Sequence, residues 1–432
     1  MSNSPSVSPL QRESAAWVPL LSGAVADRAR AAVDAIAQEL SLLPVYDAGL
    51  GAGAAGRALF FGYLEQAFPN HGHGAVAERF LDDAFTRLES APSKPALYGG
   101  YVGVAWVAQH LRQFARFRED PDPEGEVEQA LTEHLTSDSW NGNYDLIGGL
   151  VGIGVYALER RESAQARSCL QAVVQKLAAS ATFTSPGATW LTPPERLQGP
   201  IRESCPAGYF NLGVAHGVPG VIALLSVAEG CGVPEGLVAE AVEWLLRQRL
   251  AEDSDFPAWL PAGAPNAVLT PARLAWCYGD AGVAAALALA ARASGSPTWL
   301  RAAHSIARAA SQRAVEMTGV IDACLCHGSA GLAHVFARLA RSLGDPSFDA
   351  VALGWYERTL MYRKGGVGVG GFCARGSVPR SAGEPTRADS SFLSGSLGIG
   401  LVLLSAIAPI APNWDRVLLL SCSRAEQPRN AR

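Results

Sequence analysis

The chain has 432 residues, of which 49% are hydrophobic and 17% are charged, so it carries enough apolar surface for a large core and shows no sign of disorder. Its formal net charge of -5, without a basic stripe, argues against a nucleic-acid partner held through phosphate contacts. The N-terminus lacks a basic region followed by an apolar core, so we expect no secretion signal and a cytoplasmic protein.

Two stretches without charged residues, Ser204 to Ala228 and Ser390 to Trp414, are long enough to raise the question of membrane spans. Each begins with a polar, Gly-rich turn and leaves only about 12 to 16 apolar residues, fewer than a typical span needs. We therefore predict that both form buried helices and that the chain has no integral membrane segment.

One short pattern, Gly-x-x-Gly followed by an apolar run, recurs seven times along the chain. We call these copies repeats one to seven, and they are spaced by some 47 to 68 residues. The first glycines of the seven copies are Gly53, Gly100, Gly149, Gly217, Gly279, Gly328 and Gly395.

The apolar runs alternate with charged segments of helical period, such as VAERFLDDAFTRLES. A helix that is apolar on nearly all sides must be surrounded, and an amphipathic helix can cover it while facing water. The pattern predicts an all-α protein, a closed α/α toroid of seven inner and seven outer helices in a single domain over 1–432. An open solenoid of helix pairs would give a similar period, although with steadier spacing.

The two longest intervals contain Pro, Thr, Ser and Gly stretches over 180–206 and 363–388, where we expect surface excursions with short β-hairpins. The glycines themselves are expected to allow tight turns with positive φ and close backbone approach where each inner helix begins. If every Gly-x-x-Gly lies at the same end of its helix, the residues beside it converge on one mouth of the toroid.

Candidate metal ligands precede the glycines of two adjacent repeats. Cys277 lies two residues before the first glycine of repeat five, and Cys326 and His327 directly precede that of repeat six. Two thiolates and an imidazole are typical zinc ligands, and three protein ligands leave a fourth position for water or substrate. The neighbouring Cys324 is a competing ligand, but on a turn we expect it to point elsewhere.

Further polar residues lie at similar places in repeats three to five. His216 could carry a proton near neutral pH, and Asp145 could orient it or handle a proton itself. Arg273 could stabilise a developing oxyanion, and Tyr278 could donate a hydrogen bond near the metal. The structural alternatives are a core hydrogen-bonding group for His216 and a helix cap for Asp145. For Arg273 the alternative is a surface ion pair, and for Tyr278 it is packing in the cavity wall.

The motifs YFNLGVAHGVPG, AWCYGDAG and CHGSAG, together with the sevenfold glycine pattern, resemble the lanthipeptide cyclase (LanC) family from about Val45 to Leu404. The resemblance implies a seven-plus-seven helical toroid with a central zinc ion. It also implies the zinc ligands Cys277, Cys326 and His327, and the active-site residues His216, Asp145, Arg273 and Tyr278.

The family reaction is the addition of a peptide cysteine to dehydroalanine or dehydrobutyrine, which closes a thioether ring. The resemblance therefore implies a dehydrated precursor peptide with a leader as partner and a separate dehydratase. The leader is expected to dock on the irregular stretch between Ser180 and Pro206. Three alternatives stay open: addition of glutathione or other thiols to damaged proteins, a non-catalytic peptide-binding scaffold, and a glycosidase, which would need two opposed carboxylates.

Overall fold

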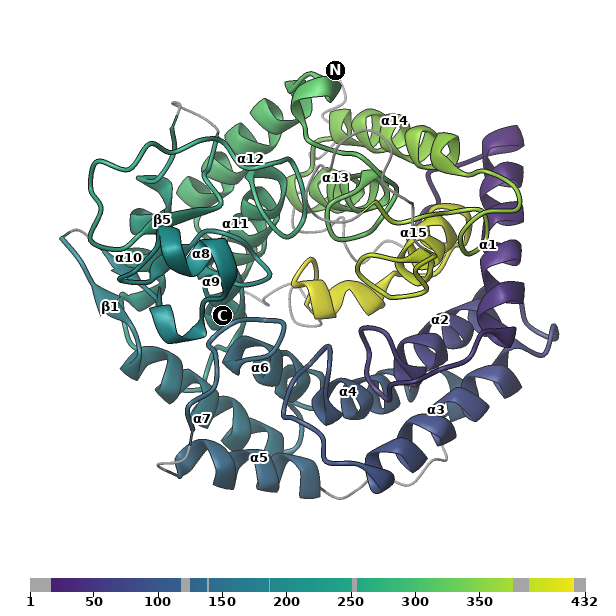
Figure 1. Cartoon of the computed structure of the whole chain (residues 1–432), viewed down its shortest axis with the longest axis horizontal. Helices are drawn as coiled ribbons and strands as arrows, with labels where there is room; N and C mark the ends of the chain where they lie inside the picture. The colour runs from purple at the N-terminus through teal and green to yellow at the C-terminus, as the bar shows by residue number, and fades with distance from the viewer. Residues whose placement is uncertain are drawn as a thin grey trace, which may run out of the picture.

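The computed structural model describes residues 17–117, 125–137, 140–185, 187–250, 255–375 and 388–422. Seven helices form an inner ring and seven form an outer ring around it (Figure 1). The inner helices are α2 (Ala54–Ala67), α4 (Tyr101–Leu111), α6 (Leu150–Glu159), α9 (Val218–Val227), α11 (Asp280–Ser294), α13 (Ser329–Leu343) and α15 (Ser396–Ile407). The outer helices are α1 (Gly23–Leu42), α3 (His73–Ser90), α5 (Glu126–Thr136), α7 (Ala164–Ala179), α10 (Leu237–Leu246), α12 (Pro297–Gln312) and α14 (Ser347–Tyr362).

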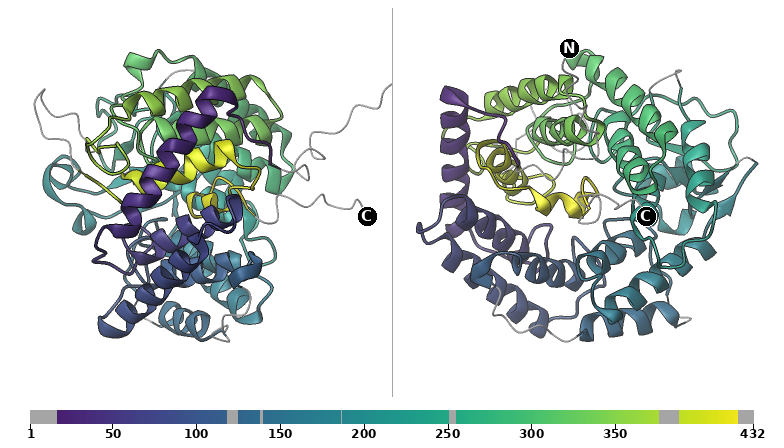
Figure 2. Two further views of the ribbon diagram at one scale, coloured as in Figure 1. Left: turned by 90° about the vertical axis from the view of Figure 1, so that its right-hand side faces the viewer. Right: turned by 180° about the vertical axis from the view of Figure 1, so that it is seen from behind.

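The inner ring is closed. Each inner helix contacts the next one along the chain, and the last, α15, contacts the first, α2. The outer helix α1 covers α15 and also contacts α14, so the first and last helices of the outer ring meet as well (Figure 2). The predicted α/α toroid is therefore confirmed, and the open solenoid is excluded.

Burial follows the two helix types that the sequence predicts. In α9, nine of the ten residues are buried. The hydroxyl of the remaining residue, Ser226, donates a hydrogen bond to the Ile222 carbonyl. In α12 only one stripe is buried, formed by Ala303, Ile306, Ala307 and Ala310. The two uncharged stretches contain the buried helices α9 and α15, and no helix in the described part of the chain is long and apolar enough to cross a membrane.

The repeated glycines are required by close backbone packing. In every repeat, a Cβ on either glycine would clash with the backbone of the loop just before the helix, and the atom it meets is usually a carbonyl oxygen six residues earlier. Our expectation of positive φ was wrong for most of these glycines. Only Gly279 of repeat five has it, at +81°, and the other glycines of the pattern lie outside the left-handed region.

The loop packs so closely because its carbonyls cap the inner helix. The first turn of a helix has N–H groups without partners inside the helix. Here Ala54 donates to the Asp47 carbonyl at 2.9 Å, and Ser329 donates to the Asp322 carbonyl at 3.0 Å. We call the six residues before the first glycine of each repeat the entry loop. The glycines let each entry loop lie against the start of its own helix.

The excursion over 180–206 forms small β-structures. Strands β1 (Thr182–Phe183) and β2 (Ala188–Thr189) make a hairpin. Strands β3 (Leu191–Thr192), β4 (Tyr209–Asn211) and β5 (Trp259–Pro261) make an antiparallel sheet in the order β3-β4-β5. The short helix α8 (Gly199–Ser204) lies between β3 and β4. Of the second excursion, 363–388, residues 376–387 lie outside the described part of the chain.

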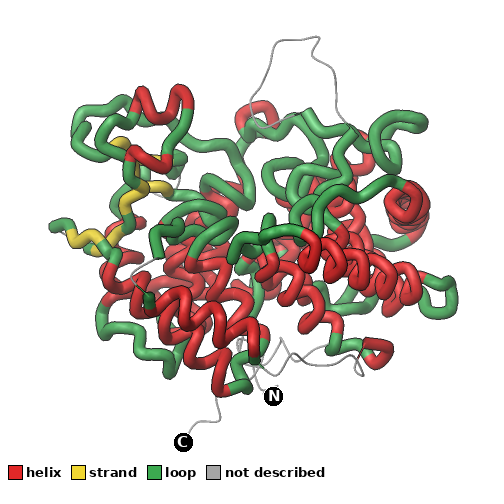
Figure 3. The backbone as a smooth tube through the Cα atoms, turned by 60° about the horizontal axis from the view of Figure 1, so that its bottom comes forward, coloured by secondary structure: helices red, strands yellow, loops and turns green. Residues whose placement is uncertain are grey.

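Figure 3 shows the strands and most of the loops gathered at one end of the ring, above the helices. Strand β4 directly precedes repeat four, so the small sheet is tied to the start of α9. The first excursion therefore contains short β-structure as expected, whereas residues 376–387 of the second lie outside the described residues.

A 3-10 helix, η5 (Asn413–Leu418), crosses the interior of the ring (Figure 1). The Tyr98 hydroxyl donates to the Val417 carbonyl at 2.8 Å, and the Trp276 indole donates to the Leu418 carbonyl at 2.9 Å. These two partners belong to repeats two and five, on different sides of the ring. The helix η5 thus joins distant repeats and fills the centre.

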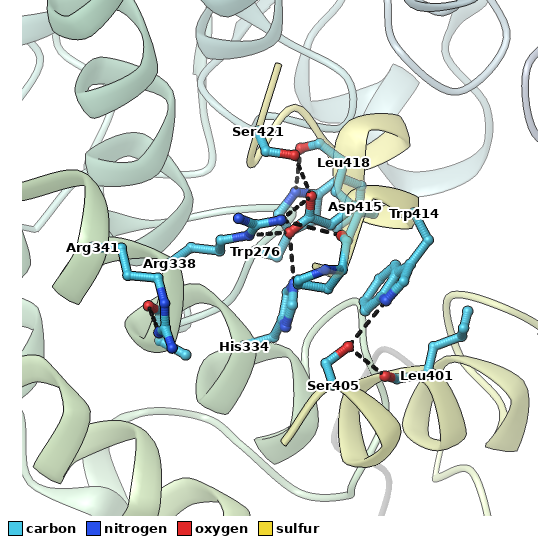
Figure 4. A network of polar contacts seen from close by, with 12 residues as sticks. Trp276, His334, Arg338, Arg341, Leu401, Ser405, Trp414, Asp415, Leu418 and Ser421 are labelled. Atoms are coloured by element: carbon cyan, nitrogen blue, oxygen red, sulfur yellow. Dashed lines mark hydrogen bonds and ion pairs between the residues drawn. The ribbon is translucent and has the colours of Figure 1, made fainter. Parts of the chain in front are cut away.

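Asp415 of η5 is the most heavily bonded carboxylate in this region (Figure 4). It is fully buried and accepts hydrogen bonds from Arg338 at 2.5 and 3.0 Å, from His334 at 2.7 Å and from Ser421 at 2.5 Å. Burial alone would raise the pKa of Asp415, but Arg338 and His334 overcome that effect and lower it to about 2.

We predict that Gly103→Ala, in repeat two, lowers the free energy of unfolding by about 3 kcal/mol, because the new methyl group would meet the Leu97 carbonyl. Gly99→Ala, four residues earlier, is the matched control, because a Cβ there meets nothing within 4 Å. Chemical denaturation of both variants measures the difference. Equal stabilities would contradict our explanation of the glycines.

We predict that Asp415→Asn costs about 3–5 kcal/mol at pH 7, because it leaves Arg338 buried without its counter-charge. Since the folded pKa is depressed, the wild-type advantage is complete above the ordinary carboxyl pKa of about 3.9 and is lost as pH falls from there towards 2. Urea unfolding at several pH values measures this. Asp34→Asn, in an exposed pair with Arg30, should cost at most about 1 kcal/mol, and an equal loss in the two variants would refute the prediction.

Candidate functional site

Backbone hydrogen bonds join the entry loops at six junctions between neighbouring repeats. The residue two positions before the first glycine takes part at each of these junctions. Bonds link repeats one to two (Gly51 N–H to Tyr98 carbonyl, 2.7 Å), two to three (Tyr98 to Ile147, 3.3 Å), three to four (Leu146 to Ala215, 3.2 Å), five to six (Cys277 to Cys326, 3.3 Å), six to seven (Cys326 to Leu393, 2.8 Å) and seven to one (Phe392 to Gly51, 2.7 Å).

This ring of backbone bonds explains why two cysteines that are 49 positions apart in sequence come together. Cys277 and Cys326 hold the same place in repeats five and six, and their backbones are directly bonded. The two thiols and a His327 ring nitrogen all lie within 4.8 Å of one another. Cys277 and His327 are buried, and Cys326 is partly exposed. The structure therefore brings all three predicted ligands into one cluster.

A second group of donors, Asp322, Cys324 and His327, is also close enough to share an ion. In that group both carboxylate oxygens of Asp322 already accept backbone N–H groups, from Cys324 at 3.0 Å and from Arg375 at 3.1 Å. Burial raises the pKa of the Cys324 thiol well above its ordinary value, which opposes the thiolate that a metal needs. The set with Cys277 and Cys326 is the better donor set.

The two thiols of the cluster differ in acidity. The pKa of Cys277 is lowered to about 5, chiefly because the Cys326 thiol donates a hydrogen bond to it and further because His327 and Arg273 lie nearby. The pKa of Cys326 is raised well above its ordinary value, chiefly by the same hydrogen bond. Positively charged neighbours of this kind favour the thiolate, which is the form that binds a metal ion or acts as a nucleophile.

His216 and Asp145, from repeats four and three, form a hydrogen-bonded dyad. The His216 Nδ1 lies 2.6 Å from Asp145 Oδ2, and Asp145 Oδ1 accepts the Gly148 N–H at 2.9 Å. Asp145 is buried, whereas the His216 side chain is 43% exposed. Because Nδ1 is engaged, Nε2 is the ring nitrogen left to meet a substrate. The two residues that we predicted to act together are in direct contact.

The dyad opens into a cavity of about 640 Å³. One side is formed by the entry loop of repeat three together with His216 and Tyr278, and the other by the excursion over 180–206. From that excursion come Leu191, Thr192, Pro193 and Arg196. Tyr278 directly follows Cys277 in the chain, so it connects this cavity to the thiols.

The position directly before the first glycine distinguishes repeats four to six from the others. It holds His216, Tyr278 and His327 in repeats four to six. In the remaining repeats it holds only small residues, namely Ala52, Gly99, Gly148 and Ser394. These three larger polar side chains, all of them predicted site residues, therefore occupy one sector of the ring.

Arg273 and Tyr278 lie at opposite ends of the entry loop of repeat five. The charge of Arg273 contributes to the lowered pKa of Cys277, so this side chain lies near the thiols. The Tyr278 hydroxyl accepts a hydrogen bond from the Asn211 side chain at 3.1 Å. Our sequence interpretation missed Asn211, which is fully buried six residues before Gly217.

These features define an α/α toroid whose entry loops carry a cluster of two thiols and an imidazole and, in the preceding repeats, a His–Asp dyad. The chain matches the model of the family described as lanthionine synthetase C-like protein over residues 44–419, and it belongs to that family. The resemblance seen in the sequence is thus confirmed.

The structure is also similar to a solved structure titled nisin cyclase. The TM-score is 0.70 and the sequence identity is 21%, with 90% of this chain and 97% of that chain covered. This likeness supports the toroid fold. None of the curated proteins matches the chain.

Proposed function

We propose that this protein is a zinc-dependent lanthipeptide cyclase, which adds peptide cysteines to dehydroalanine or dehydrobutyrine and so forms lanthionine or methyllanthionine rings. The observation that carries the proposal is the presence of both a Cys–Cys–His cluster and a His–Asp dyad on the entry loops of adjacent repeats in a member of the lanthionine synthetase C-like family. The solved structure with the similar fold is itself titled a cyclase.

The residues fit a zinc ion. Cys277, Cys326 and His327 offer two sulfurs and one nitrogen, which are the donor types of zinc sites that keep one position open. Bound zinc would lower the pKa of a substrate thiol, so that the sulfur becomes a nucleophile near neutral pH. The cluster has the separation of donors that a shared ion requires, and the low pKa of Cys277 favours its ionised form.

The dyad supplies the proton chemistry of the proposed reaction. Attack of sulfur on the β-carbon leaves an enolate, which must receive a proton at the α-carbon. His216 is suited to deliver it from Nε2, because Asp145 holds Nδ1 and stabilises the charged ring. Arg273, which lies near the thiols, is a candidate to stabilise the negative charge, and Tyr278 lines the cavity where that charge would form.

The cavity favours a peptide substrate over a glycoside. A volume of about 640 Å³ can hold several residues, and Asp145 is the only carboxylate among the described residues that line it. A glycosidase needs two opposed carboxylates, so that alternative is disfavoured. The proposed partners are a dehydrated precursor peptide with its leader, which would contact the excursion over 180–206, and a separate dehydratase that makes the dehydro residues. Addition of free thiols such as glutathione uses the same site and remains the second candidate.

We predict that the purified protein contains about one zinc ion per chain. Cys277→Ala and Cys326→Ala should lose most of it, because each removes one of three ligands. Cys324→Ala is the matched control and should retain zinc, because both oxygens of its would-be co-ligand Asp322 are already bonded. Elemental analysis after dialysis measures this. Zinc-free wild type, or full retention in the first two variants, would contradict the proposed metal site.

We predict that His216→Ala and Asp145→Asn each lower the rate of ring closure by about 100-fold or more while zinc content stays unchanged. The test substrate is a peptide with one dehydroalanine and one cysteine, and free thiols are assayed over time. His71→Ala, in the exposed turn before α3, should act as wild type. Wild-type rates in both dyad variants would contradict the proton-transfer role, and faster consumption of glutathione than of the peptide thiol would favour the second candidate.

A further inference from the structure

The entry loops of four repeats begin with the same turn, in which a side-chain oxygen accepts the N–H two residues later. The residue that supplies this oxygen lies six positions before the first glycine. In three of the four repeats it is aspartate. The pairs are Asp47 with Gly49 (2.5 Å), Asn211 with Gly213 (2.9 Å), Asp322 with Cys324 (3.0 Å) and Asp389 with Ser391 (2.8 Å).

Aspartate satisfies the turn as well as asparagine does, since both offer an oxygen at the same place. The asparagine of repeat four therefore brings one additional property, a side-chain NH₂ group. Because Oδ1 of Asn211 must accept the Gly213 N–H, the amide orientation is determined and Nδ2 faces the opposite direction. The turn in repeat four thus aims a hydrogen-bond donor away from the backbone.

That donor meets two phenol groups. The Asn211 Nδ2 lies 3.1 Å from the Tyr278 hydroxyl and 3.3 Å from the Tyr209 hydroxyl. Each phenol oxygen accepts from the amide, so the hydrogen of each hydroxyl must point to another acceptor. Both tyrosines line the cavity that also contains His216, and Asn211 lies fully buried behind them. An amide held in this way makes both hydroxyls donors towards the cavity.

We propose that Asn211 is a positioning residue, which orients the hydroxyls of Tyr209 and Tyr278 to donate hydrogen bonds to the carbonyl oxygen of the dehydro residue. The inference rests on the proposed cyclase function. As the sulfur–β-carbon bond forms, the electron pair of the double bond moves towards that oxygen. The thiol loses one proton, and one proton is then added to the α-carbon, so that the addition is balanced. Preorganised donors stabilise such a charge most when it develops.

The test is Asn211→Asp, which keeps the oxygen for the turn, as Asp47, Asp322 and Asp389 show, but replaces the donor with an acceptor. The hydroxyl hydrogens would then turn towards the new carboxylate and away from the cavity. We expect kcat for ring closure of the dehydroalanine–cysteine peptide to fall about 100-fold. KM should change little, because the lost interaction is made in the transition state. The exchange Asp47→Asn, at the same place in repeat one, should leave both constants unchanged.

A double-mutant cycle separates positioning from a general structural effect. If Asn211 acts through the phenols, Asn211→Asp should have little further effect in a Tyr209→Phe/Tyr278→Phe background. Equal losses in the two backgrounds would overturn the proposal, as would wild-type kcat in Asn211→Asp. If Asn211→Asp does not fold, the Tyr209→Phe/Tyr278→Phe variant provides the test. A wild-type kcat in that variant would also overturn the proposal.

The controls distinguish this inference from the function on which it rests. If wild type and Asp47→Asn close the ring and Asn211→Asp does so equally well, only the positioning role fails. If wild type consumes no thiol with the peptide, the proposed function fails and the positioning role fails with it.

Discussion

The close approach of each entry loop to its own inner helix is the constraint on which the rest of this structure depends. The carbonyls of the loop satisfy the N–H groups of the first helical turn, and only glycine leaves room for that contact. Because seven loops are held in the same way, neighbouring loops come close to one another, and backbone hydrogen bonds join them at six junctions. A local packing requirement thus makes side chains that are distant in sequence neighbours in space.

The fold was predictable because its signals are local and repeated seven times. The glycine spacing and the alternation of apolar and amphipathic segments are visible in single repeats, and their repetition implies the ring. The same reasoning placed Cys277 beside Cys326, since both hold one position in adjacent repeats. It was right that the glycines allow close backbone approach at the start of each inner helix, and wrong that most of them need positive φ. The catalytic roles of His216, Asp145, Arg273 and Tyr278 stay predictions.

Other features depend on partners that no local pattern reveals. Asp415 lies in a short segment without periodicity, and its partners His334 and Arg338 come from a helix about 80 residues away. The pairing of β3, β4 and β5 joins residues 191 to 261, and sequence alone suggested only that hairpins would form there. Asn211 was detectable, because aspartate or asparagine recurs six residues before the glycine. That signal appears only after the repeats are aligned by register.

The helix η5 has a consequence for how a long substrate could use this protein. It crosses the ring between Tyr98 and Trp276, and its own Trp414 and Leu418 are fully buried. For the proposed peptide substrate, the buried helix η5 would block a path through the centre of the toroid. Both ends of a bound peptide would then leave on the side from which it entered, as a loop laid across the mouth. To form successive rings, one peptide would then have to slide or rebind at the mouth. The order of ring closure would depend on which cysteine and dehydro residue can reach the site together, and not on movement of the peptide through the toroid.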